Sequence, residues 1–352
     1  MKTEKKDRLQ KPGRTTIRLV DVAHAAGCST ATVSRVQNSP DSVSPQVRDR
    51  VHAAIRKLGY MPNSAARALR SHRSRMIGIV IPTLSHAIYA CFVDAVQRRV
   101  TERGYSLLVA TFEYDLDDEL SQARVLIERG AEAVILVGEQ HRAELHRLIE
   151  AAGIPHINSY IYDADSDRPS IGIDNERAAF DVTQFLLGLG HRDIGVVLAA
   201  TRENDRAAAR LAGIRAALRQ NGLELGADRL IEQPYGIDGG RQAGRELLSG
   251  RPAPSAVIGG NDILAFGVLI ACRELGLGVP EDVSIVGFDN LEFTPHLDPP
   301  LTTMEVPAAD MGRGAVDYLF DRLSDRPVQK KIRLEPKLIA RRSTGIAPGV
   351  AG

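Results

Sequence analysis

The sequence is poor in cysteine and has no long hydrophobic run. Its 352 residues include only three cysteines, Cys28, Cys91 and Cys272. This odd, widely spaced set offers no disulfide framework and no metal-ligand spacing, and it suits a reducing compartment. No apolar run reaches the roughly 20 residues that span a membrane, and the first residues lack the apolar core of a signal peptide. We therefore expect a cytoplasmic protein without a membrane partner.

The sequence also lacks the motifs of nucleotide-dependent and hydrolytic enzymes. Gly236, Gly239 and Gly240 do not have the Gly-x-Gly-x-x-Gly spacing, and no Gly-Lys-Ser/Thr phosphate loop occurs. No Ser/His/Asp set or carboxylate pair can be assigned from spacing, and the histidines at 141, 146, 156, 191 and 296 show no metal-binding pattern. We expect no catalytic residue, no cofactor and no metal.

Positive charge is concentrated at one end of the chain. Residues 1–75 hold 16 Lys and Arg against 5 Asp and Glu, whereas the remainder holds 29 against 39. A basic head joined to an acidic body is typical of a module that binds phosphates. A solvated basic tail is the alternative for residues 2–14. It does not account for the arginines at 35, 48, 56, 67, 70, 73 and 75, which lie in patterned sequence.

Residues 17–59 predict three short helices. Apolar residues at helical spacing, a glycine at 27 and a cap at Ser29 predict helices over 19–25 and 30–36. Two helices joined in this way form a helix-turn-helix, whose second helix enters the DNA major groove. Ser44-Pro45 opens a third helix and Gly59 ends it. Its apolar face consists of Val47, Val51, Ala54, Ile55 and Leu58.

The second helix supplies the candidate DNA contacts. Thr30 and Ala31 stand at its N-terminus, with Arg35 one turn later. Thr can hydrogen-bond a base or pack on a thymine methyl, Ala offers only apolar contact, and Arg can bind guanine O6 and N7 together. We expect Thr32 and Ser34 to contact phosphates, which position the protein without specifying sequence.

Residues 21–69 carry a string of spaced motifs. It consists of Asp21-Val22-Ala23, Ala26-Gly27, Ser29, Thr32-Val33-Ser34-Arg35, Val43-Ser44, Leu58-Gly59-Tyr60, Pro62-Asn63 and Ala66-Arg67-Ala68-Leu69. The string resembles the lactose/galactose repressor family (LacI/GalR) of bacterial regulators. The resemblance extends over residues 16–346.

The resemblance implies that residues 62–70 form a hinge helix that folds on operator DNA and pairs across a dimer in the minor groove. It assigns DNA contacts to Asn63, Ala66, Leu69 and Arg70, with Leu69 as a wedge between the central base pairs. A segment of about two turns is too short for a stable isolated helix, which fits folding upon binding. A plain linker is the alternative.

From residue 76 onward, short apolar runs alternate with amphipathic helical stretches. The runs are 76–81, 105–109, 133–137, 155–161, one that begins at 171, 193–198, 256–258 and 283–286; the helical stretches are 89–103, 117–129, 143–152, 206–220, 264–275 and 308–323. This rhythm predicts parallel sheets with helices on both faces. The resemblance implies a periplasmic-binding-protein-like body of two doubly wound parallel-sheet subdomains, with helix 308–323 returning to the first.

Ligands of such folds bind at the carboxyl ends of strands. Side chains that follow the predicted strands or lie on the next helix, and that suit a polyol, are Ser85, Tyr89, Tyr160, Asp174, Arg206, Arg210, Tyr235, Asn261 and Asp289. Polar groups fork hydrogen bonds to hydroxyls, and aromatic faces cover the apolar side of a sugar. By resemblance, Arg210 and Asp289 contact sugar hydroxyls and Asn261 lies in the cleft. Tyr235 stands where some members have a stacking aromatic residue.

Two aspartates that follow predicted strands can cap helices instead of binding a ligand, and one segment lacks an acidic residue that many family members carry. We expect Asp262 to cap a helix, and Asp174 to be either a cap or a ligand contact. Many sugar-binding members carry an acidic residue where this chain has residues 158–160, Asn-Ser-Tyr. Losing a carboxylate there suits an anionic sugar acid, which Arg206 and Arg210 can hold. The segment 82–85 with Gly104-Tyr105 resembles the gluconate-repressor branch.

These observations predict a domain order. It is a basic disordered tail (1–15), a helix-turn-helix domain (16–62), a hinge (63–75), an effector-binding and dimerisation domain (76–346) and a tail (347–352). Within the effector domain we expect subdomain one at about 76–173 and 304–334, and subdomain two at about 174–303 and 335–346.

The predicted function is a DNA-binding transcriptional repressor that a small sugar or sugar acid, such as gluconate, releases from a palindromic operator. Two-fold operators imply a homodimer. A tetramer is the alternative, although the C-terminal region has no long heptad repeat. Whether the effector is an inducer or a corepressor stays open. A solute-binding protein with the same body and no DNA role is the other candidate.

Overall fold

A computed structural model describes residues 17–61, 73–250 and 252–349. The chain forms two compact units, residues 1–74 and 75–352, here called the head and the body. The predicted tail at 1–15, and the hinge residues Asn63, Ala66, Leu69 and Arg70, lie outside the described residues.

The head contains the three predicted helices, α1 (Leu19–Ala26), α2 (Thr30–Asn38) and α3 (Pro45–Leu58), with a 3-10 turn η1 (Pro40–Ser42) before α3. Gly27 ends α1 with φ 60°, a left-handed conformation that glycine adopts without strain. The Ser29 side chain accepts the N–H of Thr32 and so caps α2. Ser44 precedes α3 as expected, but its side chain makes no capping hydrogen bond.

Apolar residues from all three helices close a small core in the head. They are Val22, Ala23, Ala26, Val33, Val36, Val51 and Ala54, each at most 5% exposed. The spacing of these residues leaves the opposite side of α2 facing solvent.

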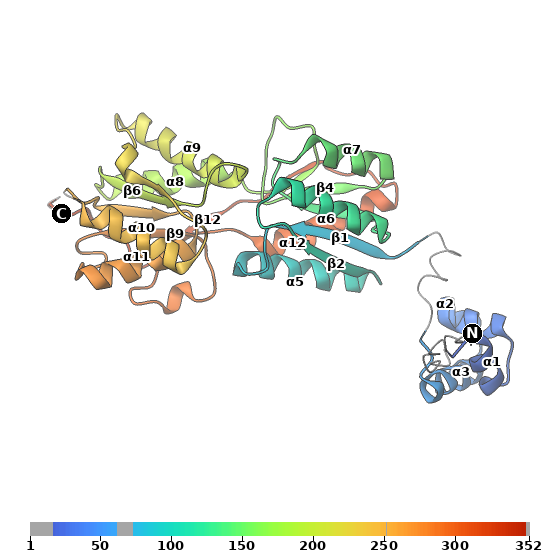
Figure 1. The fold of residues 1–352 in the computed structure, drawn as a ribbon. Helices are drawn as coiled ribbons and strands as arrows, with labels where there is room; N and C mark the ends of the chain where they lie inside the picture. Colours follow the sequence, from blue (N-terminus) through green and yellow to red (C-terminus); the bar gives the residue numbers. More distant parts are fainter. Residues whose placement is uncertain (1–16, 62–72, 251, 350–352) are drawn as a thin grey trace, which may run out of the picture. The chain divides into compact units, whose positions relative to one another are not determined.

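The body is built from two six-stranded sheets, which define two lobes (Figure 1). The first-lobe sheet has the order β11-β5-β4-β3-β1-β2 and is parallel throughout. Its strands are β1 (Met76–Ile81), β2 (Ser106–Thr111), β3 (Ala133–Val137), β4 (His156–Ser159), β5 (Ser170–Gly172) and β11 (Lys331–Arg333).

The second-lobe sheet has the order β12-β10-β9-β8-β6-β7. Its strands are β6 (Ile194–Leu198), β7 (Leu230–Glu232), β8 (Ala256–Gly259), β9 (Ser284–Asp289), β10 (Thr302–Glu305) and β12 (Lys337–Ile339). The edge strand β12 runs antiparallel to β10, so this sheet departs from the fully parallel arrangement that the strand–helix rhythm predicted.

Helices cover both faces of each sheet, because successive strand residues point to opposite sides. In β1, Ile77, Ile79 and Ile81 belong to the core beneath α5 and α12, whereas Val80 joins the core beneath α6 and α7. The first-lobe helices are α5 (Ala87–Glu102), α6 (Leu116–Glu128), α7 (Ala143–Ala152) and α12 (Ala308–Leu323), and the second-lobe helices are α8 (Asn175–Gly188), α9 (Asp205–Gln220), α10 (Ile237–Ser249) and α11 (Asp262–Leu275).

The chain crosses between the lobes at residues 173–174, 306–307 and 334–336. Helix α12 packs against α5 of the first lobe, as the sequence predicted for helix 308–323. Across the described residues, no helix has the length and apolar character needed to cross a membrane.

Candidate functional site

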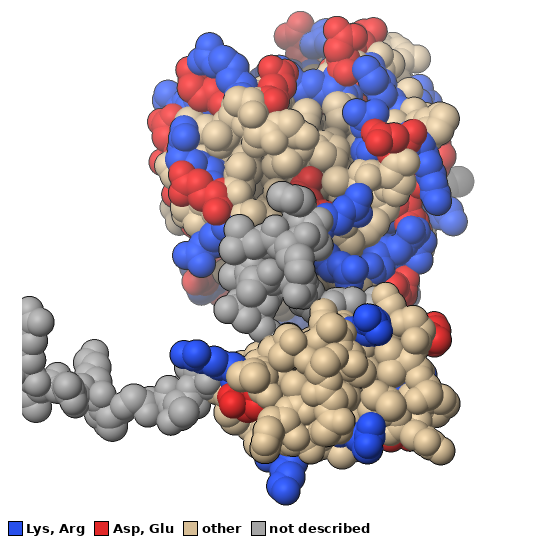
Figure 2. All heavy atoms as spheres, turned by 90° about the vertical axis from the view of Figure 1, so that its right-hand side faces the viewer, with Lys and Arg blue, Asp and Glu red and all other residues tan. Residues whose placement is uncertain are grey.

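Helix α2 presents the predicted DNA-contacting side chains at the surface of the head. Thr30, Ala31 and Arg35 are exposed, and Thr32 and Ser34 are half-buried. The Thr32 hydroxyl lies 2.9 Å from the Ser29 hydroxyl, so it takes part in the helix cap. In Figure 2 the visible face of the head is largely uncharged, with a few separate Lys or Arg and Asp or Glu side chains, whereas the body shows Lys and Arg densely interspersed with Asp and Glu. The roles of these α2 residues in DNA binding stay predictions.

A small cavity of about 30 Å³ lies between the two lobes of the body. Its lining residues are His86, Ile88, Tyr89, Tyr114 and Tyr160 from the first lobe, and Arg206, Arg210, Tyr235, Asn261 and Asp289 from the second. Seven of the nine predicted effector-binding residues therefore lie around one space. That space holds about one water molecule, so the side chains close the centre of the cleft.

Wider clefts continue from this cavity on two sides. One of about 530 Å³ shares His86, Tyr114 and Tyr235 with it, and another of about 690 Å³ shares Ile88 and Asp289. A bound sugar needs several hundred Å³, so to occupy the central cavity itself it would have to displace the central side chains or separate the lobes.

Arg210 is the central cation of the second-lobe side. Its Nε donates to Asn175 Oδ1 at 3.0 Å, its Nη1 donates to the carbonyl of Gly260, and its guanidinium lies 3.8 Å from the centre of the Phe288 ring. Asn175 in turn donates to the carbonyl of Tyr160 at 2.9 Å. These contacts fix the direction of the guanidinium and connect it to the first lobe.

Two buried carboxylates lie beside Arg210. Asp289 Oδ1 is 4.0 Å from Arg210 Nη2, and Asp262 accepts from the backbone N–H of Leu291 at 2.7 Å and from the Thr303 hydroxyl. Burial raises the pKa of both Asp262 and Asp289 above the usual range, although Arg210 opposes the effect. A protonated Asp289 can both donate to and accept from a hydroxyl.

Asp262 does not cap a helix, so that prediction is wrong. The cap of α11 is Asn261, whose Oδ1 accepts the N–H of Leu264 at 2.8 Å. Asp262 instead points into the interior of the lobe, where Leu291 and Thr303 bind it. Asn261 therefore has two roles open to it, since it also lines the cavity.

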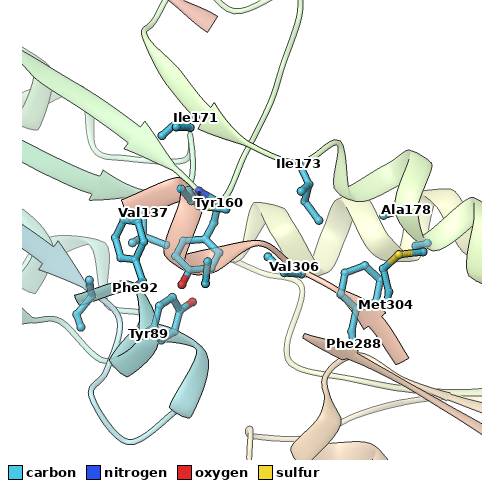
Figure 3. Packing of buried hydrophobic residues seen from close by; sticks show 14 of the residues in the cluster. Tyr89, Phe92, Val137, Tyr160, Ile171, Ile173, Ala178, Phe288, Met304 and Val306 are labelled. Atoms are coloured by element: carbon cyan, nitrogen blue, oxygen red, sulfur yellow. Dashed lines mark hydrogen bonds between the residues drawn. The ribbon is translucent and has the colours of Figure 1, made fainter. Parts of the chain in front are cut away.

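Four of the eight tyrosines of the chain line the cavity. The rings of Tyr89 and Tyr160 lie 5.2 Å apart, edge to face, and the hydroxyls of Tyr89 and Tyr114 are 3.4 Å apart. Figure 3 shows Tyr89 and Tyr160 next to each other, with Phe92 alongside. Tyr235 lies 5.1 Å from the His86 ring across the lobes. These aromatic faces can cover the apolar side of a sugar ring.

Tyr114 was missing from the residues predicted from sequence. It follows the end of β2 by three residues and adopts φ 65°, an uncommon conformation for a bulky residue. Burial raises the pKa of its hydroxyl. The rule that located the other residues, inspection of the positions after each strand, would have found it at this strand.

Ser85 and Asp174 do not line the cavity. Ser85 is exposed, and its N–H donates to the Thr83 hydroxyl at 3.1 Å. Asp174 caps α8 by accepting the N–H of Arg177 at 2.8 Å, which is the capping alternative that the sequence left open.

Two family profiles match the chain. The profile described as "Bacterial regulatory proteins, lacI family" matches residues 18–63. The profile of a periplasmic binding protein-like domain matches residues 183–344. The first match coincides with the helices of the head, and the second covers most of the second lobe together with α12.

Individual relatives extend over nearly the whole chain. Catabolite control protein A of Priestia megaterium is 31% identical over 333 residues, which cover 93% of this chain and 99% of that protein. The lac repressor dimer bound to operator and the anti-inducer ONPF superposes with a TM-score of 0.84 at 27% identity, covering 94% of this chain and 100% of that one. Transcription regulator GntR from Chromobacterium violaceum has a TM-score of 0.73 at 28% identity and covers 76% and 99%.

Proposed function

Because this chain belongs to the LacI family of bacterial regulatory proteins, we propose that it is a transcriptional repressor that binds a palindromic operator as a homodimer and responds to an anionic sugar. Its relatives are regulators, which confirms the prediction that the chain is not an enzyme. The observation that carries the effector part of the proposal is the interlobe cavity with its two buried arginines.

The DNA part of the proposal rests on the head. Helix α2 exposes Thr30, Ala31 and Arg35 on the side away from its core residues, and side chains of these types can contact base edges in a major groove. A homodimer would place two such helices on half-sites about one helical turn apart. The hinge residues Asn63, Ala66, Leu69 and Arg70 are proposed to bind the minor groove between them.

The effector part rests on charge and aromatic surface together. Arg206 and Arg210 are each 8% exposed. Arg206 already pairs with Asp205, and Arg210 lies near Asp289. A guanidinium has five N–H donors, however, and those left over beside the cavity can bind an anionic ligand. The tyrosines offer ring faces, and Asn261 with Asp289 offers hydrogen bonds to hydroxyls. A sugar acid such as gluconate combines these requirements.

Coupling between the DNA-binding head and the effector cavity would follow if the effector binds one conformation of the body more tightly than the other. An effector that prefers one arrangement of the lobes shifts the equilibrium between the operator-binding and released conformations, typically by about 1–3 kcal/mol per ligand. We propose that the sugar acid acts as an inducer. A corepressor would use the same cavity with the opposite sign.

The test is selection of bound sequences from random duplex DNA, followed by titration of the selected site with sugars and sugar acids. The proposal expects an enriched palindrome that a sugar acid releases, and that the corresponding neutral sugar releases less well. Salt-sensitive binding without enrichment would overturn the operator part. Release by neutral sugars alone would overturn the anionic effector.

A further inference from the structure

The two lobes touch at one side of the cavity through a carboxylate and a loop. Asp205, the first residue of α9 in the second lobe, accepts the backbone N–H of Glu139 and, at 3.2 Å, that of Gln140 through the same oxygen Oδ2. Both amides belong to the loop that follows β3 in the first lobe. We call this contact, between the Asp205 carboxylate and the backbone N–H groups of residues 139 and 140, the interlobe latch.

The latch also holds one of the cavity arginines. The Asp205 oxygen that does not bind the loop, Oδ1, lies 2.6 Å from Arg206 Nη1, and the same nitrogen approaches the carbonyl of Val137 at 3.4 Å. The side chains of Arg206 and Asp205 are only 9% and 17% exposed, so solvent screens this ion pair weakly. Among the described residues, the hydrogen bonds of the guanidinium all use Nη1.

The loop is built for this close approach. Gly138 has φ 90°, and an added Cβ would overlap Arg206 Nη1 and lie 2.8 Å from Asp205 Oδ1, so only glycine fits without strain. The carbonyl of Gly138 is bound by His141 Nε2 at 3.1 Å, while His141 Nδ1 lies 2.9 Å from Glu119 Oε2. The side chains of His141 and Glu119 are at most 1% exposed. Their buried contacts therefore hold the Gly138 carbonyl, and with it the loop, in place.

We propose that Asp205 is a positioning residue: the interlobe latch holds the body closed without an effector and aims Arg206 at the cavity for an anionic ligand. The latch lowers the free-energy cost of closing the body around a ligand, because the closed conformation, which binds the ligand, is already populated when the ligand arrives. The ligand part rests on the proposed effector function, but the closing part does not.

The first measurement is hydrogen exchange of the full-length protein without DNA or effector. Asp205→Ala removes the acceptor for both amides, and Gly138→Ala separates the same surfaces while Asp205 is kept. Both variants should accelerate exchange in a peptide covering residues 138–142 at least tenfold. Asp205→Asn keeps the size of the side chain and one acceptor oxygen, so its acceleration should be smaller. The control Asp181→Ala removes an exposed pair with Arg177 on α8 and should change nothing.

The second measurement is the distance between spin labels on the two lobes. Arg147→Cys on α7 and Arg219→Cys on α9 replace exposed side chains, in a background with Cys28→Ser and Cys91→Ser. The distance distribution should move to larger values in Asp205→Ala and Gly138→Ala but not in the control. Unchanged exchange and unchanged distance in Asp205→Ala would overturn the latch.

The ligand part is tested separately with gluconate and glucose. Asp205→Ala should weaken gluconate binding at least tenfold and glucose binding less, because only the anion depends on the direction of Arg206. An equal loss for both would show that Asp205 acts on closing alone and would overturn its role in orienting Arg206. If neither compound binds the unmodified protein, the proposed effector fails, while the exchange and distance results still decide the latch.

Discussion

Acidification should destabilise the body through two histidines, the buried His146 on α7 and the half-buried His156 on β4. Burial lowers their pKa values, to about 3 and about 4, and the positive charge of Arg168 adds to the effect at both. Their Nε2 atoms are buried without a hydrogen-bond partner among the described residues, and the two rings are 5.6 Å apart. A proton added at Nε2 of either ring would therefore have no hydrogen-bond acceptor. The resulting positive charge would also lie close to a second imidazole.

The sign follows from which state binds the proton first. In the unfolded chain a histidine titrates near pH 6.5, so below that pH the unfolded state gains protons that the folded state does not take up. The stability that depends on these two neutral histidines is therefore fully present above about pH 6.5. It is lost progressively as the pH falls toward 4. One pKa unit corresponds to about 1.4 kcal/mol, so each histidine should cost about 1–2 kcal/mol at pH 5.

The assay is urea unfolding of the body, followed by circular dichroism at pH 7, 6 and 5. Asp262 and Asp289 have raised pKa values and change stability in the opposite direction, so the informative quantity is a difference between variants. His146→Gln with His156→Gln should remove about 2–4 kcal/mol of the loss between pH 7 and pH 5. His296→Gln replaces an exposed histidine and should leave the loss unchanged. An identical pH dependence in the double variant and the unmodified protein would refute the reasoning.

Three further predictions concern the head, the cavity and the hinge. Ser29→Ala removes the acceptor for the Thr32 N–H and should lower the free energy of unfolding of the head by about 1 kcal/mol; an unchanged thermal midpoint would contradict a capping role. Arg210→Ala should abolish the effector response in a DNA-release assay while operator affinity stays within twofold, and a normal response would remove Arg210 from the site. Leu69→Ala should weaken operator binding and reduce the DNA bend in a gel-shift assay without changing effector affinity, whereas an unchanged bend would argue against the wedge.

Local signals in the sequence were sufficient for most elements. Gly27, Ser29, Pro45 and Gly59 limit the conformations of their own neighbours, so the helices of the head begin and end within two residues of the predicted bounds. The runs of β-branched residues located most strands of the body for the same reason. The short strands β7, β10, β11 and β12 were missed because three or four residues carry no periodic pattern.

The site was predicted less completely, because its geometry depends on distant segments. Positions at the ends of strands or on the next helix pointed to Tyr160, Arg210 and Asp289, since the strand ends of a parallel sheet converge. No local rule could decide between Asn261 and Asp262 as the cap of α11, because the choice depends on whether Thr303 and Leu291 are there to bind the second carboxylate. The pairing of Asp205 with residues 139–140 spans more than 60 positions and has no sequence signal.

The path of the chain has a consequence for the order in which the body can form during synthesis. Strand β11 and helix α12 complete the first lobe, yet they follow every second-lobe element except β12 in the sequence. As the chain leaves the ribosome, the apolar face of β1 and α5 therefore stays uncovered until more than 200 further residues have been made. The second lobe, whose sheet lacks only its edge strand at that point, is free to fold first. In the nascent protein the apolar face of β1 and α5 thus stays exposed for a long time, although the first lobe is translated first. We expect a chaperone to bind this face.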